Sequence, residues 1–435
     1  MNQTQGNTLE IRPRGPLDAV VTPPGSKSIT NRALLLAALA DGPTTLDGIL
    51  DAEDTQIMLD ALRTLGFDVT HDPQLRRGTV QGRGGHFPVN DAEIYVGNSG
   101  TSARFLTAVL GFANGNYRIH GKPRMHERPI RDLTEALVQL GTDIAHENDD
   151  GCPPIRIRGF RTQKSRSVTV SGALSSQYLS ALLMAAPLAT KRGDLEIRLT
   201  GELVSVPYIT MTLSMIRSFG IDVATDDHLA FFRFERNSVY QSQRNYRIEP
   251  DASAASYFFA AAAICGGMVR VPGLSRQSLQ GDVAFVDCLE KMGCSVGFDD
   301  DSITVSRPPN SPLRGISVDM NAYSDTAQTL GAVALFAEEP TEIRNIAHIR
   351  HKETDRIAAL AAELRKFGAV VDERPDGLKI TPPKRLAPAI VETYDDHRMA
   401  MSFAVIGMRQ PEVLIRDPHC VEKTFPEFFL ELDKL

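Results

Sequence analysis

The chain has 435 residues, 42% of them hydrophobic and 23% charged, so it is long enough for two domains with sizeable cores. Its formal net charge of −7 at pH 7 argues against a general binder of nucleic acid or other polyanions. Any anion site must therefore be a local concentration of cations. The sequence has no run of about 18 apolar residues and no apolar stretch of signal-peptide type in its first twenty residues, so neither a membrane partner nor export is predicted.

The cysteines are odd in number, scattered, and form no C-x-x-C pair. This usage is typical of reduced core thiols in a cytoplasmic protein and predicts no zinc site. The five are Cys152, Cys265, Cys288, Cys294 and Cys420.

The first clear element is a buried helix in residues 24–42, which read PGSKSITNRALLLAALADG. Its apolar run predicts a core helix, yet its first turn carries Lys27, Arg32 and several hydroxyl groups. Charged residues are seldom buried unless they are paired. A P-loop does not explain these residues, because the spacing G-x-x-x-x-G-K-[ST] is absent.

The same arrangement recurs along the chain at intervals of 71 to 76 residues. Polar first turns followed by Ala-rich helices begin near Ser28, Ser99, Ser175, Asp251, Ser324 and Asp395. An amphipathic helix follows each of the first five, and each ends at a glycine that should adopt the left-handed conformation. These glycines are Gly66, Gly141, Gly220, Gly293 and Gly368.

We therefore predict six α/β units of roughly 70 residues, grouped as two domains of three units. Residues 423–435, KTFPEFFLELDKL, resemble a sixth amphipathic copy cut off at the terminus. The polar stretch at 235–247 predicts the boundary between units three and four.

Several of these helix starts combine free N–H groups with nearby cations, which predicts an anion site. The cations are Lys27, Arg32, Arg104 and Arg398, with more in the segments 122–129, 351–356 and 421–426. Phosphates and carboxylates are the expected ligands. Simple helix capping is the alternative reading for Ser28, Asp251 and Asp395.

Carboxylates among these cations suggest acid–base chemistry. Glu353 lies in KETDR, Asp325 opens the fifth buried helix, and Asp395 and Asp396 precede His397. A carboxylate near cations normally stays ionised, which suits a base. The alternatives are a helix cap for Asp325 and a helix-dipole partner for Glu353.

Eight motifs in order give the chain a full-length resemblance to the EPSP synthase family of enolpyruvyl transferases. They are PGSKSITNRALLLAALA, GNSGTSARFL, RMHERPI, SGALSSQYLSALLMAAPL, DASAASYFFAAAAI, HKETDRIAALAAELRKFGA, DDHRMAMSF and KTFPEFF. The resemblance implies two inside-out α/β domains, each with three βαβαββ-like units, buried helices and outer sheets. The expected domains are 26–247, and 1–25 with 248–435, with the active site in the cleft between them.

The resemblance also implies the reaction, which transfers the enolpyruvyl group of phosphoenolpyruvate to the 5-hydroxyl of shikimate 3-phosphate and releases phosphate. It implies no cofactor and no metal, a monomer in the cytoplasm, and glyphosate as an inhibitor.

The site residues follow from the motifs. Shikimate 3-phosphate ligands would be Lys27, Ser28, Arg32, Ser175, Ser176, Gln177, Ser205, Asp325, His348 and Lys352. Phosphoenolpyruvate ligands would be Lys27, Asn98, Gly100, Arg128, Gln177, Arg356, Arg398 and Lys423. Catalytic residues would be Asp325 as base, with Glu353, Lys27 and Lys423.

Three positions depart from the pattern common in this family. His348 stands where an Asn is frequent, Phe105 where the well-studied enterobacterial and plant enzymes have Pro, and Val206 where they often have Lys. None of these changes removes a charged group from the expected chemistry.

Two rival functions remain. The sister enzyme that transfers enolpyruvate to UDP-N-acetylglucosamine shares the fold, but its loop carries a cysteine and residues 113–151 here have none. A non-catalytic anion-binding protein would explain the cations but not Asp325 and Glu353 among them.

Overall fold

A computed structural model describes residues 4–435 except 6, 161–163, 173–174 and 310. Residues 173 and 174 of the SGALSSQ motif, and residues 1–3 and 6 of the expected C-terminal domain, therefore lie outside the described part. The chain divides into two compact units. Gly25–Ile248 form the N-terminal unit, and Met1–Pro24 with Glu249–Leu435 form the C-terminal unit. Each of the two points where the chain passes from one unit to the other lies one residue from the boundary that the resemblance implies.

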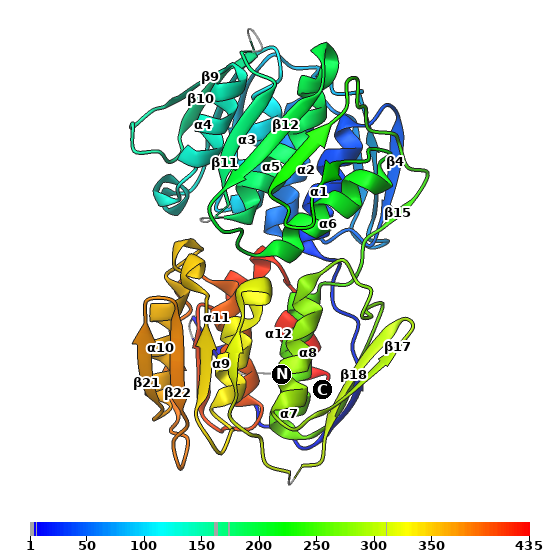
Figure 1. The fold of residues 1–435 in the computed structure, drawn as a ribbon. Helices are drawn as coiled ribbons and strands as arrows, with labels where there is room; N and C mark the ends of the chain where they lie inside the picture. Colours follow the sequence, from blue (N-terminus) through cyan, green and yellow to red (C-terminus); the bar gives the residue numbers. More distant parts are fainter. Residues whose placement is uncertain (1–3, 6, 161–163, 173–174, 310) are drawn as a thin grey trace. The chain divides into compact units, whose positions relative to one another are not determined.

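The N-terminal unit contains three four-stranded sheets in its described residues (Figure 1). The first, in spatial order, is β15 (Tyr246–Arg247), β4 (Pro43–Asp47), β6 (Arg77–Gln81) and β5 (Val69–Asp72). The second is β7 (Asp91–Tyr95), β8 (Asn116–His120), β10 (Ile155–Phe160) and β9 (Thr142–His146). The third is β11 (Ser167–Ser171), β12 (Leu195–Thr200), β14 (Phe231–Phe234) and β13 (Ala224–Thr225).

The helices of this unit are of two kinds. The core helices are α1 (Lys27–Leu39), α3 (Gly100–Leu110) and α5 (Ser176–Ala185). The amphipathic helices are α2 (Glu53–Thr64), α4 (Arg131–Leu140) and α6 (Val206–Ser218), and two 3₁₀ helices are η1 (Pro123–Glu127) and η2 (Ala186–Arg192). Every residue of α3 is buried, including the cation Arg104, so the whole helix lies within the core of its unit.

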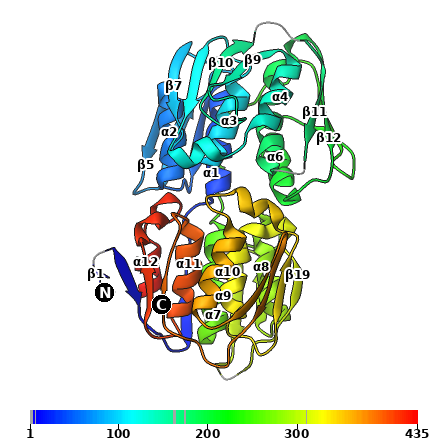
Figure 2. The same cartoon turned by 90° about the vertical axis from the view of Figure 1, so that its left-hand side faces the viewer.

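The C-terminal unit repeats the plan (Figure 2). Its first sheet, in spatial order, is β3 (Leu17–Val20), β16 (Gly267–Pro272), β18 (Ser302–Arg307) and β17 (Ser295–Asp299). The second is β19 (Ser317–Asp319), β20 (Thr341–Arg344), β22 (Gly377–Thr381) and β21 (Val370–Arg374). The third is β23 (Ala389–Val391), β24 (Val413–Arg416), β2 (Thr8–Ile11) and β1 (Thr4–Gln5). Its core helices are α7 (Ala252–Cys265), α9 (Ala327–Ala334) and α11 (His397–Gly407). Its other helices are α8 (Phe285–Lys291), α10 (Arg356–Lys366), α12 (Phe428–Asp433), η3 (Gly281–Ala284), η4 (Asn321–Thr326), η5 (Ala347–His351) and η6 (Pro418–Lys423).

All six sheets have the same internal pattern of one parallel and two antiparallel strand pairs. In the second sheet, core helix α3 joins the parallel strands β7 and β8, and α4 leads on to the antiparallel pair β9 and β10. This order is the βαβαββ unit that the resemblance implies, with core helices inside and sheets outside.

Three units are completed by strands from elsewhere in the chain. Strands β1 and β2 finish the sixth unit through the β2–β24 pairing, so that unit is divided between the two termini rather than cut off. Strand β3 pairs in parallel with β16. Strand β15 pairs in parallel with β4, so the polar stretch 235–247 is packed into the N-terminal unit instead of forming a linker.

Local signals are mostly confirmed. The five glycines predicted at helix ends have φ between +85° and +115°. Asp251 caps α7 as the alternative reading proposed, but Ser26 rather than Ser28 caps α1, and Asp396 rather than Asp395 caps α11. All five cysteines are buried free thiols. Within the described residues, no helix combines the length and apolarity needed to cross a membrane.

Candidate active site

The start of α1 shows how its cations are accommodated within a buried helix. The Ser26 hydroxyl accepts a hydrogen bond from the Ile29 amide at 3.4 Å, which ends the preceding extended segment. The Lys27 ammonium lies 3.3 Å from the carboxylate of Asp54, a buried residue of α2. Lys27 is therefore held at the helix start while 14% of its side chain stays exposed.

Arg32, one turn further along α1, is a buried cation with neutral partners. Its guanidinium donates to the hydroxyls of Thr212 at 2.8 Å and Ser180 at 3.1 Å, and to the Ser28 carbonyl at 3.0 Å. Burial lowers its pKa to about 10. No carboxylate of the described residues forms an ion pair with Arg32, so its charge is available to a bound anion.

The aromatic neighbours of Arg32 give a physical reason for one departure from the family pattern. The Arg32 guanidinium carbon lies 5.0 Å from the centre of the Phe105 ring, from α3, and 5.9 Å from that of Tyr208, from α6. Rings at these distances stabilise a desolvated cation. Phe105 therefore supports the very cation that the resemblance assigns to shikimate 3-phosphate.

A second group of cations lies at the start of α3. Arg128 donates to the main-chain carbonyl of Asn98 at 2.9 Å and to its side-chain oxygen at 3.1 Å. Arg104 donates to the Pro129 carbonyl at 2.8 Å, and burial followed by the charge of Arg128 lowers its pKa to about 10. Neither guanidinium forms an ion pair with a described carboxylate. Two adjacent buried arginines of this kind point to an anionic ligand.

Gly100 lies against both guanidinium groups. A Cβ added there would be 2.5 Å from Nη2 of Arg128 and 2.9 Å from Nη1 of Arg104. The absence of a side chain at Gly100 therefore fixes where the two arginines lie.

The other predicted residues of this unit lie at helix starts. Ser175 caps α5 by accepting from the Gln177 amide at 3.2 Å, and Ser176 is buried. Ser205 precedes α6 with φ of +54°, a strained value for a serine.

The C-terminal unit gathers six predicted residues into one ion-pair network, which we call the carboxylate cluster. Its members are Asp325, Lys352, Glu353, Arg356, Arg398 and Lys423, together with Asp396. They come from η4, the η5–α10 junction, α11 and η6, so residues nearly one hundred positions apart meet here.

Arg356 is the centre of the cluster and is only 1% exposed. It donates to Asp396 at 2.7 Å, to Glu353 at 2.9 Å and to Asp325 at 3.1 Å. Burial opposes its charge, but the three carboxylates together raise the pKa of this guanidinium. Arg356 is thus a permanent cation that fixes the orientation of both candidate proton-transfer groups.

Each candidate carboxylate also contacts a second cation. Asp325 accepts from Arg398 at 2.7 Å, and its carboxylate lies 3.7 Å from the Lys352 ammonium. Glu353 lies 3.2 Å from the Lys423 ammonium. Asp325 is therefore not a lone surface charge, and Thr326 stands at the N-cap position of α9.

Burial lowers the pKa of both Lys352 and His348. Burial lowers the pKa of Lys352, with Asp325 acting in the opposite direction. Burial, and then the charge of Lys352, lowers the pKa of His348 to about 4. The neutral His348 ring lies 2.8 Å from the hydroxyl of Ser324, the residue before Asp325.

Sequence reasoning missed some members of these groups. Asp54, the partner of Lys27, lies in an ordinary amphipathic helix and carries no motif. Arg104 belongs to the predicted cations but has no predicted ligand, and Asp396, a predicted acid–base candidate, instead caps α11 and anchors Arg356. In the sequence this cluster is marked by the like charges Lys352 and Arg356 at i, i+4, which on one helix would need an anion between them. The structure places Lys352 before α10 and Arg356 at its first residue, and Asp325 contacts both cations.

Comparison with known sequences identifies the family. A sequence model described as EPSP synthase (3-phosphoshikimate 1-carboxyvinyltransferase) matches residues 11–432. A Trichormus variabilis protein named 3-phosphoshikimate 1-carboxyvinyltransferase is 48% identical over 421 residues, covering 97% of each chain. The chloroplastic protein of that name from Arabidopsis thaliana is 45% identical over 443 residues, covering 99% of this chain and 85% of that protein.

Solved structures agree with the sequence comparison. A structure of EPSP synthase from Acinetobacter baumannii has 25% identity and a TM-score of 0.82, with 98% of each chain covered. The enolpyruvyl transferase NikO from Streptomyces tendae, at 18% identity and a TM-score of 0.77, shares the fold and covers 99% of this chain and 98% of that one. The expected fold class is confirmed. The chain belongs to the EPSP synthase (3-phosphoshikimate 1-carboxyvinyltransferase) family.

Proposed function

We propose that this enzyme transfers the enolpyruvyl group of phosphoenolpyruvate to the 5-hydroxyl of shikimate 3-phosphate, a step of the shikimate pathway to aromatic amino acids. The observation that carries this proposal is the carboxylate cluster, in which Asp325 and Glu353 share the buried Arg356. A reaction that moves protons between two anionic substrates needs carboxylates held among cations.

The buried arginines of the N-terminal unit support substrate binding. Arg32, with Lys27 and Ser28, would bind shikimate 3-phosphate, helped by Ser175, Ser176, Gln177 and Ser205. Arg128, with Asn98 and Gly100, would hold phosphoenolpyruvate. The buried guanidinium groups there have neutral protein partners, so an anion would supply the missing negative charge.

The C-terminal unit would supply the rest of the chemistry. Arg356, Arg398 and Lys423 would bind phosphoenolpyruvate, and Lys352 and His348 would contact shikimate hydroxyls. Because residues of both units serve the same two substrates, the reaction would need the units to act together. Proximity and orientation can lower an activation barrier by roughly 7–11 kcal/mol, and positioning two anions that repel one another should supply several kcal/mol of that reduction.

The reaction would proceed by addition and elimination. Protonation of the enolpyruvyl methylene develops positive charge at C2, and the 5-hydroxyl oxygen bonds to C2 while Asp325 takes its proton. The methyl group of the resulting tetrahedral intermediate then loses a proton as the C2–O bond to phosphate breaks, which restores the double bond. Glu353 would handle proton transfer at the methylene carbon, with the Lys423 ammonium 3.2 Å from its carboxylate.

Two narrower points belong to the same proposal. Glyphosate would compete with phosphoenolpyruvate, because Gly100 leaves Arg128 in place for an anion longer than the substrate. The enzyme would act as a monomer in the cytoplasm, where its five free thiols stay reduced.

Phosphate release is the direct test. We expect release with phosphoenolpyruvate plus shikimate 3-phosphate and none with UDP-N-acetylglucosamine as acceptor. The family match does not favour the UDP-sugar enzyme. Phosphate release with UDP-N-acetylglucosamine but not with shikimate 3-phosphate would overturn the proposal. So would the absence of phosphate release with both acceptors.

A further inference from the structure

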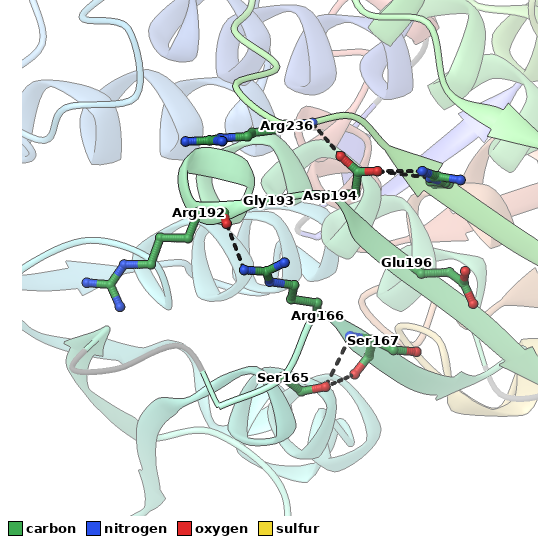
Figure 3. Close-up of a pocket in the computed structure, with 9 residues that line it drawn as sticks. Ser165, Arg166, Ser167, Arg192, Gly193, Asp194, Glu196 and Arg236 are labelled. Atoms are coloured by element: carbon green, nitrogen blue, oxygen red, sulfur yellow. Dashed lines mark hydrogen bonds and ion pairs between the residues drawn. The ribbon is translucent and has the colours of Figure 1, made fainter.

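A separate group of arginines, distinct from those of the proposed substrate sites, lines an open pocket on the N-terminal unit (Figure 3). The pocket has a volume of about 720 Å³, within the range of small-molecule sites. Its charged lining residues are Arg166, Arg192, Arg233, Arg236, Asp194 and Glu196. None of them belongs to the substrate sites proposed above.

The third sheet explains why these residues meet. Strands β11 and β12 are parallel, so Arg166 before β11 and Asp194 before β12 lie at the same end of the sheet. Strand β14 is antiparallel to β12, and Leu195 pairs with Phe234, which brings Arg233 and Arg236 to that end as well. Three separate chain segments therefore converge on the pocket.

Both carboxylates of the pocket already have cationic partners. Asp194 accepts from the Arg233 side chain at 2.5 Å and from the Arg236 amide at 2.9 Å. Glu196 forms an ion pair with Arg198, which does not line the pocket. Four arginines face two carboxylates, so the lining carries a net charge of +2 in a protein whose overall charge is −7.

One of the remaining arginines is fixed in place. Arg166 donates to the Arg192 carbonyl at 2.9 Å, and its guanidinium lies directly over Gly193. A Cβ at Gly193 would be 2.8 Å from the guanidinium carbon, and the φ of +151° also favours glycine. The guanidinium is thus preorganised, which lowers the entropy that binding an anion costs.

Arg192 and Arg236 complete the cationic wall. Their guanidinium groups make no hydrogen bond or ion pair with the described residues, and Figure 3 shows both side chains extending toward the left of the view, away from Asp194 and Glu196. Arginine forks match phosphate oxygens in bidentate geometry. Among the described lining residues there is no aromatic side chain, so a nucleobase would find no aromatic ring to stack on.

We propose that this pocket is a binding site for small anions of the diphosphate and polyphosphate class, separate from the substrate sites. Strand β11 has five residues and a length of roughly 17 Å at about 3.3 Å per residue. The pocket lies at its first residue, whereas Ser175 and Gln177 follow its last. An anion bound here would therefore not compete with shikimate 3-phosphate. This inference does not depend on the proposed function.

Pyrophosphate is the probe for the test, with shikimate 3-phosphate present to occupy the site proposed for that substrate. Hydrogen–deuterium exchange would report protection of residues 164–172 and 192–198, and its dependence on concentration would give the affinity. The test variant is Arg192→Ala/Arg236→Ala, because neither side chain has a described partner to lose. The matched control is Arg217→Ala, an exposed arginine of α6 paired with Asp222.

We expect the wild type and Arg217→Ala to show the protection, and the double variant to bind pyrophosphate at least about tenfold more weakly. Each single variant should give part of this loss, and phosphate release in the enzyme assay should be unchanged in all of them. Protection should weaken as salt is added. Equal protection in the double variant, or none in the wild type at millimolar pyrophosphate, would overturn the proposal. Binding of ADP more than tenfold tighter than pyrophosphate would overturn the ligand class.

Discussion

Asp325 lies among three cations, and these neighbours determine what its removal should do. Its two oxygens accept hydrogen bonds from Arg356 and Arg398, and Lys352 lies 3.7 Å away. As the proposed base for the 5-hydroxyl, it must present an unprotonated oxygen to the substrate. In the proposed function Arg356 and Arg398 bind phosphoenolpyruvate while Asp325 accepts a proton, so a neutral Asn at residue 325 should separate substrate binding from proton transfer.

Asp325→Asn should keep shikimate 3-phosphate binding and lose turnover. A general base contributes about 10²–10⁴-fold, so kcat should fall by that factor while the dissociation constant changes little. The measurement pairs steady-state kinetics with calorimetric binding, and Asp372→Asn, an exposed residue paired with Arg374, is the control. A fall in kcat of less than about tenfold would assign the base elsewhere.

His348 should make the protein sensitive to acid. Its folded pKa is about 4, lowered first by burial and then by Lys352 and Arg356, against the partial opposition of Asp325. An unfolded histidine titrates near 6.5, so between these values the unfolded chain binds a proton that the folded chain does not. The contribution of His348 to the unfolding free energy therefore keeps its full value above about pH 6.5 and decreases as the pH falls toward 4.

His348→Asn should remove this contribution. Between pH 7 and pH 5 the wild type should lose about 2 kcal/mol of unfolding free energy that the variant does not lose. Urea unfolding at both pH values measures the difference, and His419→Asn, an exposed histidine near Glu422, is the control. Equal acid losses in wild type and His348→Asn would show that this histidine is not the group responsible.

Single residues also show where sequence reasoning is limited. The capping residues of α1 and α11 are displaced from the predicted ones in opposite directions, to Ser26 and Asp396. A cap is decided by which side chain reaches the free amides, and neighbouring Ser or Asp residues look alike in a sequence. Asp54 could not be assigned at all, because its role arises from the packing of α2 against α1.

At the scale of elements, the start of α3 and the segment after η1 contact each other and together fix the position of the Arg128 guanidinium. The helix begins at Gly100, and Arg128 from the second segment lies against that glycine while it binds Asn98. Arg104 and Tyr178 both donate to the Pro129 carbonyl, at 2.8 Å and 2.6 Å, which anchors the residue next to Arg128. The position of the Arg128 guanidinium therefore depends on the absence of a side chain at residue 100.

Gly100→Ala should weaken glyphosate more than phosphoenolpyruvate. The added methyl must move the Arg128 guanidinium, which narrows the space that a longer anion needs. Overpacking of this kind costs about 1–3 kcal/mol, or roughly 5- to 150-fold in affinity. The inhibition constant and the KM for phosphoenolpyruvate, measured in both proteins, give the comparison.

The control for this prediction is Gly15→Ala, because a Cβ added at Gly15 meets no atom within 4 Å. Gly15→Ala should leave both constants unchanged. Losses of the same size for glyphosate and phosphoenolpyruvate in Gly100→Ala would show that this glycine does not discriminate between the two anions. A wild type indifferent to millimolar glyphosate would show that the pocket differs from the one inferred.

At the scale of the whole molecule, the repeat was predictable and the way it closes was not. Helix periodicity and the terminal glycines reveal six units, because each unit keeps its own local signals. The pairing of β2 with β24, and of β15 with β4, joins segments about 400 and 200 residues apart in sequence. Such long-range pairings leave no periodic pattern, and the two-residue strands β1 and β15 are too short to be detected.

This closure predicts which pieces of the chain can fold alone. The N-terminal unit contains all strands of its three sheets, including β15. The continuous segment 249–435 lacks β2 and β3, so β24 and β16 would each expose an unpaired edge. Leu9, Ile11 and Leu17, which belong to its core, would also be missing.

We therefore expect residues 25–248 to unfold cooperatively as an isolated fragment, and residues 249–435 not to do so. A permuted fragment that joins residue 435 through a flexible linker to residues 1–24 should regain a cooperative transition, because β2 and β3 restore the sheets and Arg14 can pair with Asp433. Thermal unfolding followed by circular dichroism measures all three fragments. The control is a permuted fragment with Ile11→Asp, which places a charge in the core and should lose the transition again. If residues 249–435 unfold as cooperatively as the permuted fragment, the N-terminal strands are not what completes this unit.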